Sequence, residues 1–519
     1  MNIRYILPAM VAAVLGTAAI SCTDDNSSYG GGALPALSVV VPENDDMPVY
    51  NFNYGDNCVL TPDVRYDGTG ELQYEWSVGT YIDGLKGPLE VVSNEKTLTY
   101  FFPQGGSYYA HLTVTDGTVG IVQDYAISIN RTFEQGYLIV SNNNAGEGNL
   151  AFIKDLTREE IEEGLPQTLM ENCLQRVNSN IGKSKLCGSM IIQWYAWTGN
   201  TVSPVNRLVI VTENEGLYID PNTFVLSSEI NYEEVMPGFK GDDFMLRNTN
   251  PLVMDMKQRR YLSLNSDYMF GYEDSEWKDH FFDYVCKNTL MVGENQTHYN
   301  FFINRSPLAV EEKTYYGWTS TQELKDADGN TLFNNEELVC AFLGDGIPNS
   351  SGTTYPGCII SRNKSNGNYF ATTLTGFGGY SFNLDIHSRG KIAVDASTAI
   401  PDTEARIVTS QTYHRTYYPC DNNIYVMLAD GGTMQLPSKE KAAINIPAGE
   451  ELTFMDIHTI TNGEELLVAT ADKSTGRGNV YIYDVRDVRT DNPNPSPKAS
   501  YKNCADRITS IMYKPRIAN

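Results

Sequence analysis

The C-terminal stretch of the chain reads LTFMDIHTI (452–460), EELLVATAD (464–472), NVYIYDV (479–485), PKASYKN (497–503) and DRITSIMYK (506–514). The first four segments have the length and composition of strands, and turn residues separate them, so they predict one four-stranded antiparallel unit. The fifth segment reads as the first strand of another unit, with nothing after it. Near the other end of the repeat, GYLIVSNN (136–143) reads as a second strand that lacks a first. We therefore expect the C-terminal strand to pair with this segment and close a ring.

Short apolar strands recur between these two ends. From residue 138 to residue 466 they take six steps of about 55 residues each. Propeller blades are four-stranded units of roughly 40–50 residues, so blades with insertions fit this period. The sequence predicts an all-β propeller of six or seven blades over residues 132–519. The recurring strands are Leu138–Val140, Leu208–Val211, Leu252–Met254, Phe301–Ile303, Cys358–Ile360, Ile424–Leu428 and Leu466–Val468.

Helix signals are few in this region. LTREEIEEG (156–164) contains a capping box, Thr157 with Glu160, and Gly164 is placed to end the helix. SEWKDHFFDYVCKN (275–288) predicts a second helix. Both would be insertions between strands.

Residues 35–131 predict a separate, smaller all-β module. SYYAHLTVTDG (107–117) alternates strictly, which is typical of a strand with one buried face, and Asp116-Gly117 predicts the turn that follows. Trp76, in LQYEWSVG (72–79), is expected in the core between two sheets. The apolar face of the alternating strand carries Tyr108, Ala110, Leu112 and Val114.

The N-terminus has the pattern of a secretion signal. Residues 1–21 contain Arg4 and then an apolar stretch too short for a comfortable membrane span, followed by small residues and Cys22. A thiol at this place can be acylated, and the mature chain would then begin with a lipid anchor. The alternative is an ordinary signal peptide with an accidental cysteine. Residues 22–34 form a tether with an acidic start and a Ser/Gly-rich continuation.

Composition excludes some functions. The formal net charge of −26 argues against binding nucleic acid and against docking on anionic lipid through a basic patch. Setting Cys22 aside leaves eight cysteines, an even number that permits disulfides in an exported chain. No C-x-x-C spacing occurs, and several cysteines lie inside apolar runs, where a small buried hydrophobic side chain is the simpler interpretation.

No catalytic motif is recognisable. The sequence contains no H-E-x-x-H, no G-x-S-x-G and no G-x-x-x-x-G-K-[ST], and its six histidines are scattered. With 64 acidic residues, a glycosidase-type carboxylate pair could still be assembled from different blades. An enzyme is therefore unsupported but not excluded, and no cofactor is expected.

One loop has a calcium-binding pattern. In DADGNTLFNNEE (326–337), Asp326, Asp328, Asn330 and Glu337 fall at positions 1, 3, 5 and 12 of an EF-hand-like loop. Position 6, which requires glycine in such a loop, is Thr331. A plain Asp-Gly hairpin turn explains the same residues.

Three aromatic clusters are candidate binding surfaces. Flat amphipathic rings stack on sugars or pack on peptide side chains when loops expose them. The alternative is core packing between blades. The clusters are Trp194, Tyr195 and Trp197; Tyr315, Tyr316 and Trp318; and Tyr413, Tyr417 and Tyr418.

Several of these segments resemble known bacterial families. The segment before Cys22 resembles the lipobox of bacterial lipoproteins, and Asp24 and Asp25 are similar to the acidic export tag of Bacteroidota. YEWSVG (74–79) and FPQGGSYYAHLTVTDGTVG (102–120) resemble PKD and PKD-like domains, which are Ig-type β-sandwiches. The whole arrangement resembles the PKD-like family lipoproteins of Bacteroidota.

This resemblance implies a function. Members of that family are associated with SusC/SusD-type uptake systems, in which a substrate-binding lipoprotein caps a TonB-dependent transporter. We therefore expect a non-catalytic accessory protein, lipid-anchored on the extracellular face of the outer membrane, that captures or presents an oligopeptide or a glycan. The alternative is a surface enzyme that degrades polysaccharide or peptide with a propeller active site.

Overall fold

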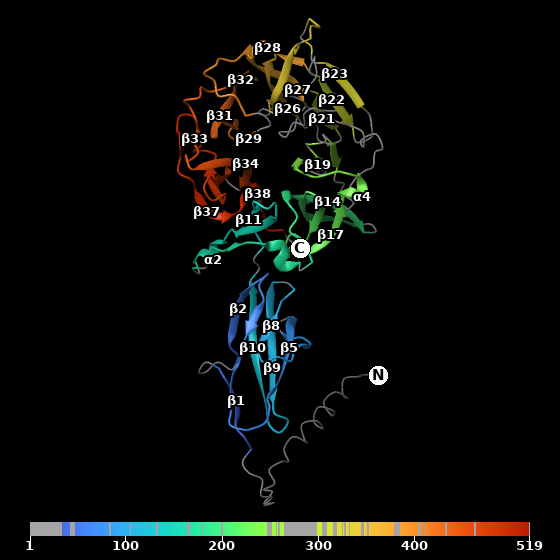
Figure 1. The fold of residues 1–519 in the computed structure, drawn as a ribbon, viewed down its shortest axis with the longest axis vertical. Coiled ribbons are helices and arrows are strands. Elements are labelled where there is room, and N and C mark those ends of the chain that lie inside the picture. Colours follow the sequence, from blue (N-terminus) through green and yellow to red (C-terminus); the bar gives the residue numbers. More distant parts are fainter. Residues whose placement is uncertain are drawn as a thin grey trace, which may run out of the picture. The chain divides into compact units, whose positions relative to one another are not determined.

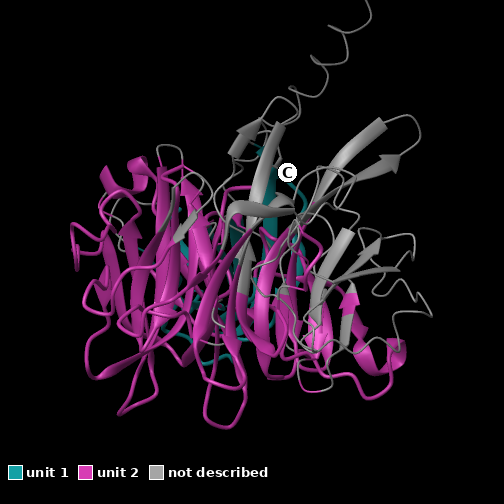
Figure 2. Ribbon diagram, turned by 90° about the horizontal axis from the view of Figure 1, so that it is seen from above, with its two compact units in different colours: residues 1–52, 57–101, 107–128 teal, residues 53–56, 102–106, 129–519 magenta. Residues whose placement is uncertain are grey.

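The computed structural model divides the chain into two compact units (Figure 2). The N-terminal unit comprises residues 1–52, 57–101 and 107–128, and the C-terminal unit comprises residues 53–56, 102–106 and 129–519. The structure describes residues 34–41, 47–82, 85–103, 105–130, 133–162, 164, 167–178, 180–198, 201–245, 252–255, 257, 260–263, 298–303, 309–314, 319–323, 325, 328–331, 333–343, 347–349, 352–377, 385–402, 406–410, 412–430, 433–460 and 463–517.

The N-terminal unit is built from antiparallel strands. Its main sheet has the order β2 (Val49–Asn53), β10 (Gly120–Asn130), β9 (Gly106–Thr115), β5 (Gln73–Ile82) and β6 (Leu85–Lys86), with β7 (Glu90–Ser93) also paired to β5. Two smaller pairs join β1 (Leu37–Val40) to β4 (Asp63–Tyr66) and β3 (Cys58–Leu60) to β8 (Leu98–Tyr100).

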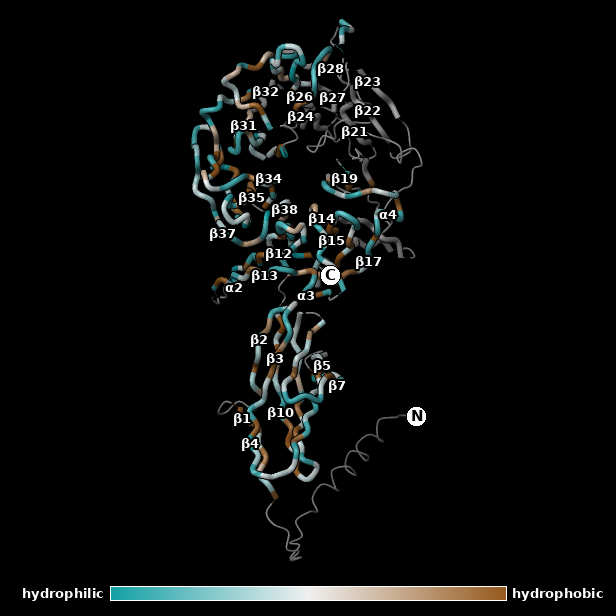
Figure 3. The backbone as a smooth tube through the Cα atoms, in the orientation of Figure 1, coloured by the Kyte–Doolittle hydropathy of each residue, from teal (hydrophilic) through white to brown (hydrophobic). Residues whose placement is uncertain are grey.

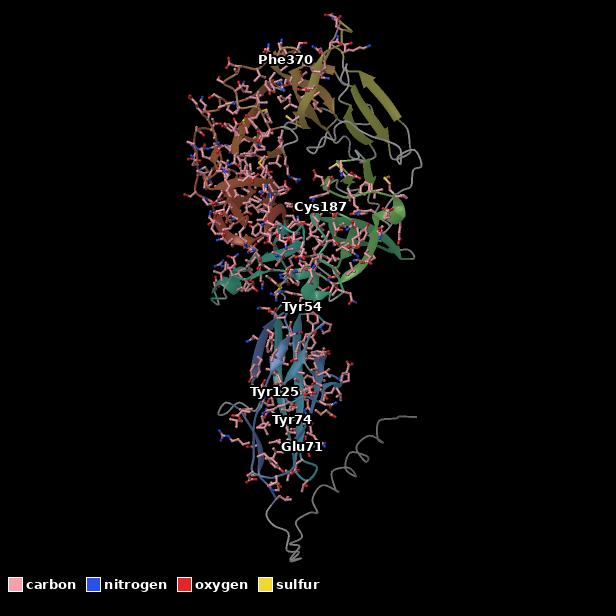
Figure 4. All side chains as sticks on the ribbon, viewed as in Figure 1. Tyr54, Glu71, Tyr74, Tyr125, Cys187 and Phe370 are labelled. Atoms are coloured by element: carbon pink, nitrogen blue, oxygen red, sulfur yellow. The ribbon has the colours of Figure 1, made fainter. Side chains whose placement is uncertain are left out.

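The predicted core of this unit is confirmed. Trp76 is fully buried, its indole N–H donates to the Glu95 carbonyl at 3.1 Å, and its ring lies 5.5 Å from Tyr125 (labelled in Figure 4). The apolar face of β9 is buried as expected. Tyr109, on the opposite face, is also buried because it pairs with Gly79, whose missing side chain leaves room for the ring.

The predicted turn after β9 is also present. Asp116 accepts hydrogen bonds from the N–H groups of Thr118 and Val119, both at 2.8 Å. Gly117 has φ +86°, a value that glycine adopts without steric cost.

The C-terminal unit contains seven antiparallel sheets among its described residues, and they follow one another around a central axis in chain order (Figure 1). In the sheets that Figure 3 colours by hydropathy, hydrophobic residues lie on the strands and many of the outer connections are hydrophilic. The first sheets are β38 (Arg507–Lys514), β11 (Gly136–Asn142), β12 (Gly148–Lys154), β13 (Leu169–Met170); β14 (Leu186–Thr198), β15 (Thr201–Thr212), β16 (Glu215–Ile219), β17 (Leu226–Asn231); β18 (Asp243–Met245), β19 (Leu252–Asp255), β20 (Arg260–Ser263); and β21 (His298–Ile303), β22 (Ala309–Thr314), β23 (Thr319–Glu323).

Three further sheets complete the set, and this arrangement is propeller-like. They are β24 (Glu336–Leu343), β26 (Gly352–Asn363), β27 (Tyr369–Phe377), β28 (Asp385–Ala393), with β25 (Ile347–Asn349) on β26; β29 (Val408–Ser410), β30 (Arg415–Cys420), β31 (Asn423–Asp430), β32 (Thr433–Gln435), with β33 (Ile444–Asn445) on β31; and β34 (Glu450–Ile460), β35 (Gly463–Asp472), β36 (Gly478–Asp484), β37 (Ala499–Ala505).

The C-terminal strand pairs with the first strand of this unit, as predicted. β38 and β11 run antiparallel from the pair Gly136↔Lys514 to the pair Asn142↔Arg507, and Ile511 is 1% exposed. Because β11 lies at the start of the repeat and β38 at its end, this sheet joins the two ends of the unit. A β-bulge after Val140 is the one irregularity in the pairing.

Three short helices lie in the described part of the unit: α2 (Arg158–Glu162), α3 (Cys173–Val177) and α4 (Tyr232–Val235). The predicted capping box of α2 is confirmed, since Glu160 accepts from the Thr157 N–H at 2.9 Å and donates its own N–H to the Thr157 hydroxyl at 3.3 Å. Gly164 follows with φ +73°. The helix predicted over 275–288 lies outside the described residues. Among the described residues, every helix is too short or too polar to span a bilayer.

Six cysteines of the described part are buried: Cys58, Cys173, Cys187, Cys340, Cys420 and Cys504. Burial raises the pKa of the Cys58, Cys187 and Cys420 thiols to about 12. These thiols therefore act as small buried hydrophobic groups.

Candidate functional site

A pocket of about 550 Å³ lies in the C-terminal unit. Four of the seven sheets contribute to its wall: β18, the sheet that begins with β29, the sheet that begins with β34, and the closing strand β38. Its charged and polar lining includes Asp243, Asp402, Arg406, Asn422, Glu451 and Lys473. This volume lies in the range of sites that bind small molecules.

A two-residue hairpin positions one side of the pocket. Asp421 and Asn422, between β30 and β31, both have positive φ (48° and 64°), and Asp-Asn suits the type I′ turn that needs this geometry. The Asn422 amide donates to the Glu450 carbonyl at 3.0 Å and accepts from the Leu452 N–H at 2.7 Å. The turn is thus fixed to the first strand of the next sheet.

Arg406 is held in the pocket wall by two contacts. Its Nη2 donates to Asp456 at 2.7 Å, and its guanidinium carbon lies 4.6 Å from the centre of the Phe454 ring. Its Nε and Nη1 have no hydrogen-bond partner among the described residues. The guanidinium is therefore oriented by the protein while part of its donor capacity remains unused.

Glu451 is tied to the closing strand. Arg507 donates to both of its carboxylate oxygens at 2.9 Å, in a bidentate pair between β34 and β38. Arg507, and to a lesser degree Lys473, holds the pKa of the Glu451 carboxyl below its usual range. Glu451 is therefore anionic at neutral pH.

Asp402 lies beside Cys420 and Asp421, and ligand atoms of the three residues lie within 4.8 Å of one another. Desolvation raises the pKa of Asp402, and the nearby Asp421 charge adds to this. The raised pKa of the Cys420 thiol disfavours the thiolate form that binds metal, and Lys439 lies 3.4 Å from Asp421. The chemistry of this donor set does not favour a metal site.

Lys473 extends from the loop between β35 and β36. The Asp472 carboxylate shapes this loop by accepting hydrogen bonds from the Ser474 hydroxyl and from the N–H groups of Ser474 and Thr475. These hydrogen bonds, above all the one from the Ser474 hydroxyl, lower the pKa of Asp472 to about 2. Gly476 has φ +73°. The Lys473 N–H donates to Gly449 at 2.8 Å and its Nζ donates to Ala448 at 3.1 Å.

The loop between β26 and β27 has the same construction. Asn363 accepts from the N–H groups of Ser365 and Asn366, and Gly367 has φ +74°. The Lys364 N–H donates to Asn335 at 2.9 Å, as that of Lys473 does to Gly449. Lys364 is not among the residues that line the pocket.

The structure describes only some of the aromatic side chains that were predicted to bind a ligand. Tyr417 and Tyr418 are fully buried, and their hydroxyls donate to carbonyls of Val488 (3.1 Å) and Ala399 (2.9 Å) respectively. The binding prediction is wrong for these two tyrosines, which pack in the core instead. Trp194, Tyr195 and Trp197 lie on β14, whose backbone pairs with β15, but their side chains are outside the described part. Tyr315, Tyr316 and Trp318 are outside the described residues, as are Cys22, Asp24 and Asp25.

The calcium candidates are only partly described. Asp326 is outside the described residues, whereas Asp328 and Asn330 are exposed in a turn flanked by the Lys325↔Thr331 bridge. Glu337 lies on β24, and Arg362 donates to it at 3.4 Å. These contacts fit the hairpin alternative, and calcium binding stays a prediction.

The sequence did not single out the pocket residues. The lining residues are spread along the chain from Asp243 to Thr509. The one sequence signal near the pocket is the similarity of the loops DKSTG (472–476) and NKSNG (363–367), of which the first contains the lining residue Lys473. Nothing around Asp402 or Arg406 marks those side chains before the sheets are assembled.

Comparisons with known proteins add little. No protein-family model matches the chain, and no curated protein matches it. A quinonprotein alcohol dehydrogenase-like protein from Bacteroides thetaiotaomicron is 11% identical, with a TM-score of 0.47 over 92% of this chain and 99% of that chain. Lignostilbene dioxygenase from Pseudomonas brassicacearum is 8% identical, with a TM-score of 0.37 over 70% and 88%. AztD from Citrobacter koseri is 8% identical, with a TM-score of 0.32 over 86% and 98%. These similarities are too weak to indicate a function.

Proposed function

We propose that the protein is a non-catalytic, ligand-capturing surface lipoprotein that works beside a SusC/SusD-type importer of oligopeptide or glycan. The observation that carries the ligand-capturing part is the pocket. Its wall combines charges fixed by ion pairs, such as Glu451 with Arg507, with the Nη1 group of Arg406, which has no hydrogen-bond partner among the described residues. Polar groups that are held in place before binding lose little freedom when a ligand arrives, which favours recognition.

The finer architecture belongs to this proposal. The N-terminal unit is a PKD-like β-sandwich, supported by the buried Trp76 and the alternation of β9. The C-terminal unit is a seven-bladed propeller, with each of its seven sheets counted as one blade. The sandwich would serve as a spacer that carries the propeller away from the membrane.

Lipid attachment at Cys22 and surface export through Asp24 and Asp25 rest on the sequence pattern. Replacing Cys22 with Ala should move the protein from the membrane fraction to the soluble fraction. Replacing both aspartates with Ala should leave the protein in the membrane but hide it from extracellular protease. Digestion of that double variant at the wild-type rate would contradict the sorting role.

The transporter partnership is tested by purification. The protein, solubilised gently with its lipid from its native outer membrane, should bring a SusC/SusD-type pair with it. The Cys22→Ala protein, recovered from the soluble fraction and taken through the same purification in the same detergent, is the matched control. If the wild-type protein is recovered alone, the import role is wrong.

One observation favours a second candidate, a surface enzyme. Asp402 and Glu451 line the same pocket, and their environments move their pKa values in opposite directions. Such a divergence is how one carboxyl becomes a general acid while another stays ionised. Peptide or glycan fragments produced by the wild-type protein but not by the Asp402→Asn protein would favour this candidate over capture.

A further inference from the structure

The pocket carries two kinds of charge, those already paired and those still open. Glu451 is neutralised by Arg507, and Asp456 by Arg406. In contrast, Lys473 forms no ion pair with the described residues, and its Nζ reaches only the Ala448 carbonyl. Arg406 binds Asp456 through Nη2, and its Nη1 has no hydrogen-bond partner among the described residues. Lys473 Nζ and Arg406 Nη1 are therefore the cationic donors that the pocket wall offers to a ligand.

An open anionic group lies on the same wall. Asp402 accepts the Asp421 N–H at 3.2 Å, and no cation is paired with its carboxylate among the described residues. Desolvation is the main cause that raises the pKa of Asp402, and an incoming cation beside the carboxylate would favour its charged form. The pocket thus offers complementary charges to a ligand that carries both signs.

The aromatic side chains of the pocket are poorly placed for sugar stacking. Phe244 is 6% exposed and Phe454 is 7% exposed. The guanidinium of Arg406 also covers the face of Phe454. Because a sugar ring needs an open aromatic face on which to lie, the lining favours a charged ligand over a neutral glycan.

We propose that the pocket binds a short peptide with free termini, whose carboxylate contacts Arg406 and Lys473 and whose ammonium contacts Asp402. This inference rests on the proposed function and narrows its ligand class. Charge-assisted hydrogen bonds at both ends give such a ligand its specificity, since a blocked end removes a charge and leaves a protein charge without a partner.

The experiment is a calorimetric titration with a library of tripeptides. The free-termini library should bind, and libraries that are amidated at the C-terminus or acetylated at the N-terminus should bind about 10- to 100-fold more weakly, the loss of one charge-assisted hydrogen bond. Arg406→Gln should weaken binding of the free library by about the same factor and should not weaken the amidated library further. Asp402→Asn should weaken binding of the free library by a similar factor and should not weaken binding of the acetylated library further.

Arg362→Gln is the matched control for Arg406→Gln. Arg362 also pairs with a carboxylate, that of Glu337, and lies over an aromatic ring, that of Tyr369, but it does not line the pocket. This variant should bind the free library as the wild-type protein does. If Arg406→Gln does not fold, Lys473→Gln replaces it, because Lys473 is exposed and its replacement should leave the fold intact.

The outcomes separate this inference from the proposed function. Binding of neutral or uronate-containing oligosaccharides but not of tripeptides overturns the peptide inference and leaves ligand capture standing. Equal binding of free and blocked tripeptides also overturns it. Cleavage of the library by the wild-type protein overturns the non-catalytic function itself, and absence of any binding at millimolar concentration overturns the inference.

Discussion

Two sheets of the C-terminal unit share an internal network, and only one of them contributes to the pocket. In the sheet that begins with β24, Ser361 donates to Glu336 at 2.6 Å, and Lys391 pairs with the same carboxylate. In the sheet that begins with β34, Thr470 and Lys502 bind Glu450 in the same manner. Each glutamate is the first residue of its sheet's first strand.

The likeness extends to the aromatic partner of the lysine. Lys391 lies 4.5 Å from the centre of the ring of Phe370, and Lys502 lies 4.3 Å from that of Tyr481. Figure 4 labels Phe370. The loops that carry Lys364 and Lys473 are also built alike. The comparison teaches that the repeat maintains the fold, whereas ligand recognition depends on where each copy lies relative to the pocket.

The difference in burial predicts the largest effect. Lys391 is 18% exposed, whereas Lys502 is 50% exposed. Glu336→Ala removes the carboxylate beside a mostly buried lysine and should lower the free energy of unfolding by about 3–5 kcal/mol, measured by denaturant unfolding. Glu337→Ala, which removes the neighbouring exposed pair with Arg362, is the control and should cost about 0–1 kcal/mol. Equal losses in the two variants would refute the assigned burial effect.

Glu450→Ala should have a smaller effect than Glu336→Ala. Lys502 is half exposed and can turn to water when its partner is removed, so the main loss is that the Thr470 and Tyr481 hydroxyls no longer have the carboxylate to which they donate. We expect a loss of about 1–3 kcal/mol in the same unfolding measurement. A loss larger than that of Glu336→Ala would mean that the two networks are not ranked by lysine burial.

The two loop glycines should respond alike in stability. Gly367 and Gly476 have φ values of +74° and +73°, where an alanine side chain is strained. Each Gly→Ala change should cost about 1–2 kcal/mol. Only Gly476→Ala should also weaken tripeptide binding, because it disturbs the loop of Lys473. If Gly367→Ala also weakened tripeptide binding, the prediction that only the loop of Lys473 contacts the ligand would be wrong.

Acid should weaken the Glu450 network. Burial alone would raise the pKa of Glu450, but hydrogen bonds from Lys502, Thr470 and Tyr481 outweigh it and hold that pKa below its usual value of 4.5. A carboxyl with a lower pKa in the folded state adds stability above pH 4.5, and this is lost as the pH falls through the folded-state pKa. Unfolding midpoints of the wild-type protein should therefore fall more steeply below that pH than those of Glu450→Gln. If the unfolding midpoints of the two proteins fell with pH in parallel, ionisation of Glu450 would not contribute to the acid sensitivity.

The sequence predicted those features that are encoded locally or by pattern. Strand alternation in β9, the capping box of α2 and the unpaired strand at 506–514 each contain their own signal, and each is confirmed. Tyr417 was misread because its buried hydroxyl is satisfied by carbonyls of Val485 and Val488, about 70 residues away. A residue-type pattern cannot reveal such distant partners.

The pocket could not be predicted for a related reason. Arg406 acquires its orientation from Asp456 and Phe454, and Glu451 acquires its fixed charge from Arg507 on the closing strand. These partners meet only when the sheets are arranged around the axis. The calcium loop and the lipid anchor are local signals, and they stay predictions.

The most direct test of the account compares the two matched lysines. Lys473→Gln and Lys364→Gln remove the same charge from exposed positions in loops of the same construction, so any effect on folding should be small in both. For tripeptides with free termini, Lys473→Gln should raise the dissociation constant about tenfold or more, and Lys364→Gln should leave it unchanged. Equal dissociation constants for the two variants would contradict the claim that the pocket beside Lys473 is the binding site.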